Sequence, residues 1–221
     1  MRTDVREVFA VAAAAYERGN PLLAVERPET QGLLPPLAGR DVLDLGAGRG
    51  HYAALARAAG AGRVVALDLT PQMLEAAPPP AIVADAGRLP IRDRSFDVVI
   101  AALVLSYLSD AGRALREIAR ILRAGGTLVA SDLHPVAVRH GWRRRFHTGS
   151  GATVEVEAPP LALVEIRQAL AGAGLVLESL REPAVGASLE PHFRRAGRRD
   201  FADVAGAPLL VVFRARKGGL A

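Results

Sequence analysis

The sequence contains no cysteine and a single lysine, Lys217, and only 5% of its residues are aromatic. Without cysteine the chain can form neither disulfides nor thiolate metal sites, and it has no thiol nucleophile. Half of the residues are hydrophobic, yet no apolar run approaches the ~20 residues that a membrane-spanning helix needs. Residues 1–7 mix charges and lack the apolar region of a signal peptide, so we expect a soluble, cytoplasmic protein.

The formal net charge is +5, and arginine carries almost all of the positive charge. A basic protein can bind nucleic acid or acidic substrates. An excess of arginine over lysine, together with abundant alanine, glycine and proline, also results from GC-rich coding. We favour that explanation, because an excess of charge is not a patch until clustering is shown. The arginines at 143–145, 194–195 and 198–199 are candidates for binding phosphate or carboxylate.

A glycine-rich turn follows an apolar segment that is predicted to be a strand, residues 41–45. Three glycines stand at alternate positions before a predicted helix: Gly46, Gly48 and Gly50. Glycines between a strand and a helix N-terminus let a ligand come close to the backbone. A dinucleotide fingerprint would need glycine or alanine at position 51, where this chain has His51. The carboxylate of Asp44 would repel a pyrophosphate and suits a cationic ligand, so the pattern predicts S-adenosylmethionine rather than NAD.

Apolar periodicity and turn residues predict alternating strands and helices between residues 41 and 132. Strands are expected at 41–45, 63–68, 81–84, 96–102 and 126–132, and helices at 50–59, 71–77 and 110–123. This order predicts a parallel sheet with helices on both faces. Before it we expect an amphipathic helix at 3–18, stopped by Asn20-Pro21, and a proline-rich connection at 28–40. After it we expect a hairpin of 143–148 and 152–158, a helix at 160–171, and strands at 175–180 and 209–214.

Four segments of this core resemble, in order, the motifs of the class I S-adenosylmethionine-dependent methyltransferases, in particular small-molecule enzymes of the type 11 group. The segments are 44–50, 64–74, 84–90 with 95–99, and 115–128. The resemblance implies an α/β fold with a Rossmann-like, seven-stranded, mostly parallel sheet and helices on both faces. It divides a single domain, 1–221, into an N-terminal helical lid (1–40), a cofactor-binding core (41–132), a hairpin insert acting as a lid (133–158) and a C-terminal part (159–221).

The resemblance also implies a set of residues that bind S-adenosylmethionine. They are Asp44, Gly46, Ala47, Gly48, Gly50, Asp68, Leu69, Met73, Asp85, Ala86 and Ala102. Asp68 ends the second strand, where an acid accepts hydrogen bonds from both ribose hydroxyls. Leu69 and Met73 would flank the adenine. Asp85 would accept a hydrogen bond from the adenine amino group, with the Ala86 N–H reaching the ring.

The methyl acceptor is expected beside the cofactor, in contact with Tyr16, Ser106, Trp142 and Phe146. His134 and His147 are candidate general bases, because histidine titrates near neutral pH. Some relatives have a Leu-x-Leu-His-Tyr sequence whose histidine is replaced here by Ser106. A methyl transfer also proceeds with proximity and orientation alone, so no base is required. We expect no metal, because the end of the fourth strand lacks the carboxylates that catechol-type enzymes place there.

Other residues narrow the reaction. The lack of cysteine excludes C5-pyrimidine and arsenic methyltransferases, and residues 101–103 lack the Asn-Pro-Pro-Tyr-like sequence of amino-methylating DNA enzymes. The expected function is methyl transfer from S-adenosylmethionine to an oxygen or nitrogen of a small molecule. An RNA or protein methyltransferase is an alternative supported by the positive charge. A non-catalytic cofactor-binding regulator is a second alternative, supported by Ser106. We expect no membrane partner, and we assign no oligomeric state.

Overall fold

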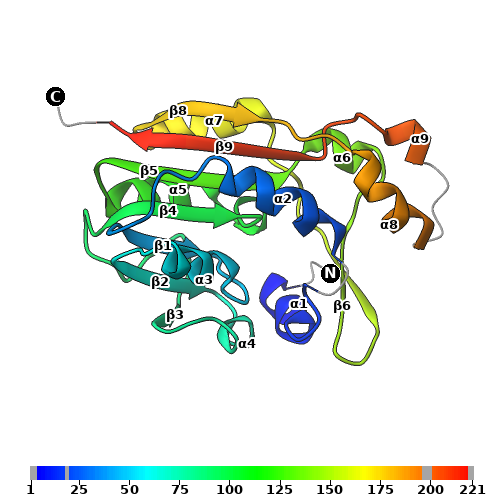
Figure 1. Ribbon diagram of the computed structural model, residues 1–221, viewed down its shortest axis with the longest axis horizontal. Helices are drawn as coiled ribbons and strands as arrows, with labels where there is room; N and C mark the ends of the chain where they lie inside the picture. Colours follow the sequence, from blue (N-terminus) through cyan, green and yellow to red (C-terminus); the bar gives the residue numbers. More distant parts are fainter. Residues whose placement is uncertain (1–3, 18–19, 196–200, 219–221) are drawn as a thin grey trace.

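A seven-stranded sheet forms the centre of the protein (Figure 1). The computed structural model describes residues 4–17, 20–195 and 201–218. The strands lie in the order β3-β2-β1-β4-β5-β9-β8. They are β1 (Asp41–Leu45), β2 (Arg63–Asp68), β3 (Ala81–Val83), β4 (Phe96–Ala102), β5 (Leu122–Leu133), β8 (Leu175–Arg181) and β9 (Leu210–Lys217). β9 runs antiparallel to β5 and β8, and the pairs among β1 to β5 are parallel. The expected fold class is confirmed.

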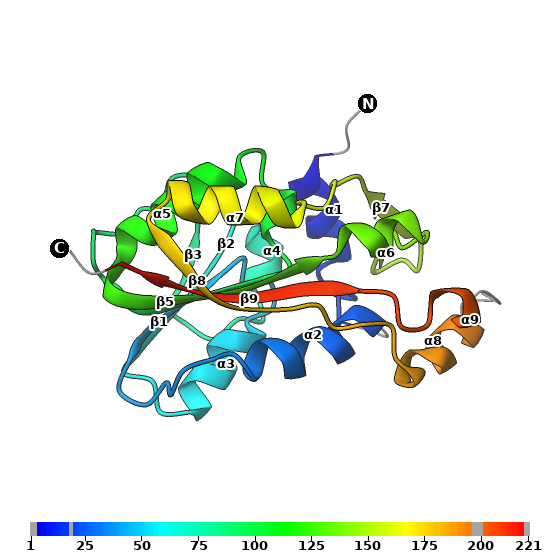
Figure 2. The same ribbon diagram turned by 90° about the horizontal axis from the view of Figure 1, so that it is seen from above.

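Helices cover both faces of the sheet (Figure 2). One face carries α2 (Pro21–Gln31) and α3 (His51–Ala58), and the other carries α5 (Ala111–Ile121) and α7 (Leu163–Gly172). Parallel strands in this position are apolar on both sides, since both sides are covered. β1 is an example: its side chains Val42, Leu43 and Leu45 point to both faces, and none of them has exposed surface. Because β1, β2 and β4 run parallel to one another, their carboxyl ends lie side by side at one edge of the sheet.

The N-terminal segment differs from the expected single helix. α1 spans only Val5–Ala12, and residues 3 and 18 of the expected helix lie outside the described residues. Asn20 and Pro21 do not stop a helix but begin α2: the Asn20 side chain accepts a hydrogen bond from the Leu22 N–H (3.1 Å), and proline takes the first helical position. The prediction of a connection at 28–40 was wrong for residues 28–31, because α2 continues through Pro28 and ends at Gln31.

A two-stranded hairpin, β6 (Arg144–His147) and β7 (Thr153–Val156), stands apart from the main sheet. α1 packs on it through a small buried cluster of Val8, Ala12, Phe146 and Val156. Figure 1 shows α1 and β6 together, at the end of the molecule away from the C-terminus. The hairpin and α1 thus cover the edge where the parallel strands end.

Short helices complete the described chain. They are α4 (Pro71–Leu74), α6 (Pro135–Arg139), α8 (Glu190–Arg195), α9 (Phe201–Val204) and the 3-10 turns η1 (Leu105–Tyr107) and η2 (Ala187–Leu189). Trp142, Phe193 and Val204 join α8 and α9 to a buried cluster that also contains the end of β5. Within residues 4–17, 20–195 and 201–218, no helix is long and apolar enough to cross a membrane, and no cluster of three or more histidines and acids could hold a metal ion.

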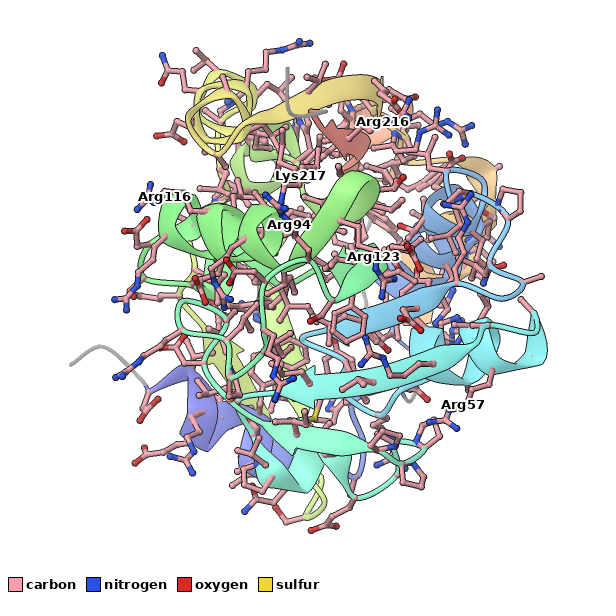
Figure 3. All side chains as sticks on the ribbon, turned by 90° about the vertical axis from the view of Figure 1, so that its left-hand side faces the viewer. Arg57, Arg94, Arg116, Arg123, Arg216 and Lys217 are labelled. Carbon is pink, nitrogen blue, oxygen red and sulfur yellow. The ribbon has the colours of Figure 1, made fainter. Side chains whose placement is uncertain are left out.

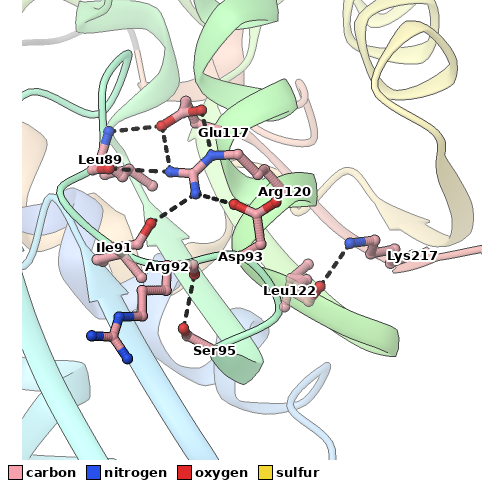
Figure 4. A network of polar contacts seen from close by, with 9 residues as sticks. All are labelled: Leu89, Ile91, Arg92, Asp93, Ser95, Glu117, Arg120, Leu122 and Lys217. Atoms are coloured by element: carbon pink, nitrogen blue, oxygen red, sulfur yellow. Dashed lines mark hydrogen bonds and ion pairs between the residues drawn. The ribbon is translucent and has the colours of Figure 1, made fainter.

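Many basic side chains lie at the opposite end of the sheet from α1 and the hairpin. Figure 3 looks at this end and labels Arg57, Arg94, Arg116, Arg123, Arg216 and Lys217. Several of these cations have partners within the fold. Arg123 bonds to Asp41 (2.8 Å) and Asp97 (2.7 Å). Figure 4 shows Arg120 bonded to Glu117 and Asp93, and Lys217 donating to the Leu122 carbonyl. The last two arginines of the 194–199 region, at 198–199, lie outside the described residues.

Candidate active site

A cavity opens at the carboxyl ends of β1, β2 and β4, with α1 forming part of its wall. Of the residues expected to bind a cofactor, those lining it are Asp44, Gly46, Ala47, Gly48, Asp68, Leu69, Met73, Asp85, Ala86 and Ala102. Tyr16 also lines it, together with Val5 and Phe9 of α1. We call this space the first cavity. Residues far apart in the sequence meet here because the strand ends lie side by side at one edge of the sheet.

The glycine turn shapes the floor of the first cavity. Gly46 has a left-handed backbone (φ +67), and a Cβ there would lie 2.5 Å from a methyl carbon of Val104. Gly48 has φ +54, and its Cβ would lie 3.1 Å from the end of Met73. Both positions favour glycine for conformation, and Gly46 also requires it for space. Gly50 differs: it does not line the cavity, and a Cβ there would meet Ala77 and Pro78.

Asp44 is a deeply buried acid of the wall, with 2% of its surface exposed. Its Oδ2 accepts a hydrogen bond from the Ala53 N–H at 2.8 Å. Burial raises the pKa of Asp44 to about 7, an effect that the backbone hydrogen bond opposes and the nearby Asp68 and Glu26 carboxylates reinforce. No arginine, lysine or histidine contacts this carboxyl group in the described chain. A buried acid without a cation is suited to a ligand that brings one.

Asp68 ties the end of β2 to the glycine turn. Its Oδ2 accepts from the Gly48 N–H at 2.9 Å, and its Oδ1 accepts from the Thr70 N–H at 2.8 Å. Burial raises the pKa of Asp68, while these backbone hydrogen bonds oppose the shift. The Thr70 side chain makes no capping bond to α4. Asp68 thus supports the turn and the start of α4 in addition to facing the cavity.

Glu26 also lines the first cavity, and the sequence analysis missed it. It lies on α2 and is 1% exposed. Its carboxylate accepts hydrogen bonds from the hydroxyls of Tyr52 (2.8 Å), Thr30 (2.6 Å) and Ser131 (2.8 Å). The spacing of Glu26 and Thr30, one helical turn apart, was the available signal. The proline-rich connection expected at 28–40 places Thr30 outside a helix, so the pair was not predicted.

Acidic side chains outnumber basic ones around the first cavity. The acids are Glu17, Glu26, Asp44, Asp68 and Asp85, and the arginines are Arg27 and Arg49. Arg27 is paired with Glu17, and Arg49 donates to the Ala13 carbonyl at 3.1 Å. The wall therefore favours a cationic ligand over a pyrophosphate. This set of carboxylates, together with the left-handed glycine turn at Gly46 and Gly48, fits S-adenosylmethionine.

The sequence matches a family model described as "Methyltransferase domain" over residues 43–130. An uncharacterized methyltransferase of Mycobacterium tuberculosis (strain ATCC 25618 / H37Rv) is 41% identical over 132 residues, which cover 58% of this chain and 52% of the relative. Demethylmenaquinone methyltransferase of Clavibacter sepedonicus is 35% identical over 155 residues, 63% of each chain. The chain thus spans about half to two thirds of these relatives.

Residues 43–130 of this chain therefore resemble a methyltransferase domain, and the two relatives named above are both methyltransferases. The fold agrees with a solved structure of 1,6-didemethyltoxoflavin-N1-methyltransferase from Burkholderia thailandensis, which holds 1,6-didemethyltoxoflavin and S-adenosylhomocysteine. The TM-score is 0.60 at 19% identity, covering 99% of this chain and 92% of the other.

A second cavity shares part of its wall with the first. Its lining comes from the start of α2, the ends of β4 and β5, and the hairpin: Tyr16, Asn20, Pro21, Leu22, Leu103, Tyr107, Leu133, Trp142, Arg143, Arg144, Arg145 and Phe146. Three residues line both cavities, namely Tyr16, Leu103 and Tyr107. Leu103 has φ +54, which is rare for a residue with a side chain. Such strain is found most often at functional sites.

The residues expected at the acceptor divide into two groups. Tyr16, Trp142 and Phe146 line the second cavity. Ser106 lines neither cavity: it is buried, its hydroxyl donates to Asp132 (2.7 Å), and it accepts from Arg144 (2.5 Å). The structure therefore places Ser106 in a buried polar network that holds the hairpin, and its contact with the acceptor stays a prediction that this geometry does not favour.

The two candidate histidine bases lie outside both cavities. His134 caps α6, with its Nδ1 accepting from the Val136 N–H (3.1 Å) and its Nε2 lying 3.0 Å from Glu182 Oε1. Both ring nitrogens are thus occupied. His147 lies on the exposed side of β6, near the Thr153 hydroxyl (3.4 Å). Their role as bases stays a prediction that this geometry does not favour.

Proposed function

We propose that this methyltransferase transfers a methyl group from S-adenosylmethionine to an oxygen or nitrogen of a small molecule bound in the second cavity. The observation that carries the proposal is that two cavities with different linings share three wall residues, Tyr16, Leu103 and Tyr107. A relative named for demethylmenaquinone and a fold relative that binds 1,6-didemethyltoxoflavin support a small-molecule acceptor.

The residues of the first cavity would hold the cofactor. Asp44 would bind its cationic amino group, and Asp68 would accept hydrogen bonds from the ribose. Leu69, Met73 and Ala86 would flank the adenine, with Asp85 at its rim. Once bound, S-adenosylmethionine supplies an electrophilic methyl group on a sulfonium.

The remaining contribution of the protein is orientation and the exclusion of water. Tyr16 and Tyr107 lie at the junction of the cavities, and burial raises the pKa of both phenols. They therefore stay neutral near pH 7 and can orient an acceptor by hydrogen bonding. α1 and the hairpin cover the junction, which keeps water from a reacting sulfonium. Holding the acceptor in line with the methyl group can supply a large part of the barrier lowering in such displacements.

The experiment is a turnover assay with S-adenosylmethionine and three acceptor classes: small hydroxy- and amino-aromatics, transfer RNA, and peptides. Formation of S-adenosylhomocysteine is measured by mass spectrometry. We expect turnover with a small molecule, its loss in Asp68→Ala, and its retention in the surface control Asp93→Ala. Turnover confined to RNA or peptides would contradict the proposal. Tight S-adenosylhomocysteine binding without turnover in any class would favour a regulator instead.

A further inference from the structure

The two cavities differ in the charge of their walls. The first is dominated by carboxylates. In the second, the charged side chains are arginines alone, at three successive positions of the hairpin: Arg143, Arg144 and Arg145. No acid is part of that wall in the described ranges. Adjacent sites of opposite charge select ligands of opposite charge, because an ion of the wrong sign is repelled and left unpaired.

Two of the three arginines are already neutralised. Arg144 Nη2 lies 2.6 Å from Asp132 Oδ1, and both side chains are buried, at 7% and 1% exposure. The Arg145 Nε bonds to Glu155 at 2.8 Å across the hairpin. Arg144 therefore fixes the hairpin to the end of β5, and Arg145 stiffens the hairpin. Neither adds an uncompensated charge to the second cavity.

Arg143 is held in a different way. Its Nη1 donates to the carbonyl oxygens of Trp142 (2.9 Å) and Val138 (3.0 Å). These bonds fix the guanidinium, yet no carboxylate contacts it in residues 4–17, 20–195 and 201–218. Its Nε and Nη2 have no acceptor there either. An arginine with Nε and Nη2 available presents the parallel pair of donors that binds a carboxylate in a bidentate manner.

The rest of the wall is aromatic. The rings of Tyr16 and Phe146 are stacked, with centroids 5.4 Å apart and planes at 27°. Tyr107 lies under the Arg144 guanidinium, whose carbon is 4.9 Å from the ring centroid. Trp142 adds a further apolar surface. Walls of this kind bind flat ligands.

We infer that the methyl acceptor is a planar aromatic molecule bearing a carboxylate, with Arg143 binding the carboxylate and the aromatic wall contacting the ring. The inference rests on the proposed methyl transfer, since it names the acceptor of that site. It makes Arg143 a determinant of specificity: an acid is selected over its neutral amide because only the acid satisfies the guanidinium.

The test is calorimetric titration of the full chain saturated with S-adenosylhomocysteine. The probes are 4-hydroxybenzoate, 3,4-dihydroxybenzoate and indole-3-acetate, each compared with its amide. We expect at least one acid to bind at least tenfold more tightly than its amide. Arg143→Met should reduce that preference below threefold. Arg143→Lys, which keeps the charge but lacks the paired donors, should fall between the two. Arg194→Met is the control, because Arg194 is exposed on α8, is paired with Glu190 and lines neither cavity.

The affinity for S-adenosylhomocysteine is measured for each variant and reports whether the first cavity is intact. The inference is overturned if no acid binds more tightly than its amide, or if the preference survives in Arg143→Met while the cofactor affinity is unchanged. Failure of the wild-type chain to bind S-adenosylhomocysteine at all would overturn the proposed function instead. The two failures are thus distinguishable in one series of titrations.

Discussion

Replacing Asp44 by asparagine should stabilise the ligand-free protein and abolish cofactor binding. Burial raises the pKa of Asp44 from 3.8 to about 7. A shift of that size corresponds to about 4 kcal/mol of unfavourable ionisation in the folded state. The side chain is almost fully buried, so solvent does not reduce this figure substantially. Asparagine keeps an oxygen that can accept from the Ala53 N–H but carries no charge.

The sign of the pH dependence follows from the direction of the shift. Between pH 3.8 and about 7 the folded chain binds more protons at residue 44 than the unfolded chain does. Raising the pH through this window therefore destabilises the folded wild-type protein, and the effect is complete above about pH 7. Asp44→Asn should match the wild type near pH 4 and be more stable, by up to about 4 kcal/mol, at pH 8.

Ligand binding should show the opposite trend. A cationic ligand favours the ionised carboxylate, so binding to the wild type releases a proton below about pH 7. The affinity for S-adenosylmethionine should then rise by up to about tenfold per pH unit as the pH approaches 7, and level off above it. Asp44→Asn should lose most of the affinity together with its pH dependence.

Urea unfolding from pH 4.5 to 8.5 measures the stability difference, and calorimetry at pH 6 and 8 measures the affinity. Asp97→Asn is a control of opposite sign: burial alone would raise the pKa of Asp97, but the Asp41 N–H and the Arg123 guanidinium outweigh it and lower the pKa. That variant should lose stability at pH 8. The reasoning is refuted if Asp44→Asn is no more stable than the wild type at pH 8, or binds S-adenosylmethionine within threefold of it.

Three further predictions follow from the contacts described. Asp68→Ala should weaken S-adenosylhomocysteine binding by ~1.5–3 kcal/mol, the scale for losing hydrogen bonds to a charged group; a change under ~0.5 kcal/mol in calorimetry, with the fold intact, would remove Asp68 from the site. Gly46→Ala should reduce cofactor affinity, because the new methyl group would collide with the side chain of Val104. Adding Val104→Ala should restore part of the lost affinity, and equal affinities of the single and double variants would contradict the steric explanation. Arg144→Met should lower the free energy of unfolding in urea by ~3–5 kcal/mol, since it leaves Asp132 buried without its cation. The double variant with Asp132→Leu should lose less stability than the single variant, and additive losses would show that the two residues do not act as a pair.

The sheet could be predicted from the sequence because its signals are local. β1, β2 and β4 begin and end at the expected residues, since a buried parallel strand is a short apolar run with a turn at each end. β5 begins earlier than expected, at Leu122 instead of residue 126. Its pairing with β4 extends back to Phe96, and such pairing is a tertiary contact that the apolar pattern does not contain.

The errors have physical causes as well. Asn20-Pro21 suits both the end of one helix and the start of the next, and a proline such as Pro28 lowers the expectation of a helix around it. The role of Ser106 depends on Asp132, 26 residues away, and on Arg144, 38 residues away. His134 follows a strand end, which is where catalytic residues gather, but it is also a helix N-cap before Pro135. A pattern in the sequence shows neither which distant residues a side chain contacts nor the direction in which it points.

The most direct test of the central claim is a crystal structure of the full chain grown with S-adenosylhomocysteine. We expect the nucleoside in the first cavity, with the ligand's amino group within hydrogen-bonding distance of Asp44, roughly 2.7–2.9 Å, and the ribose hydroxyls on Asp68. The second cavity should stay open beside the sulfur, between Tyr16 and Tyr107. A ligand bound elsewhere, or one in the first cavity that contacts neither Asp44 nor Asp68, would contradict it.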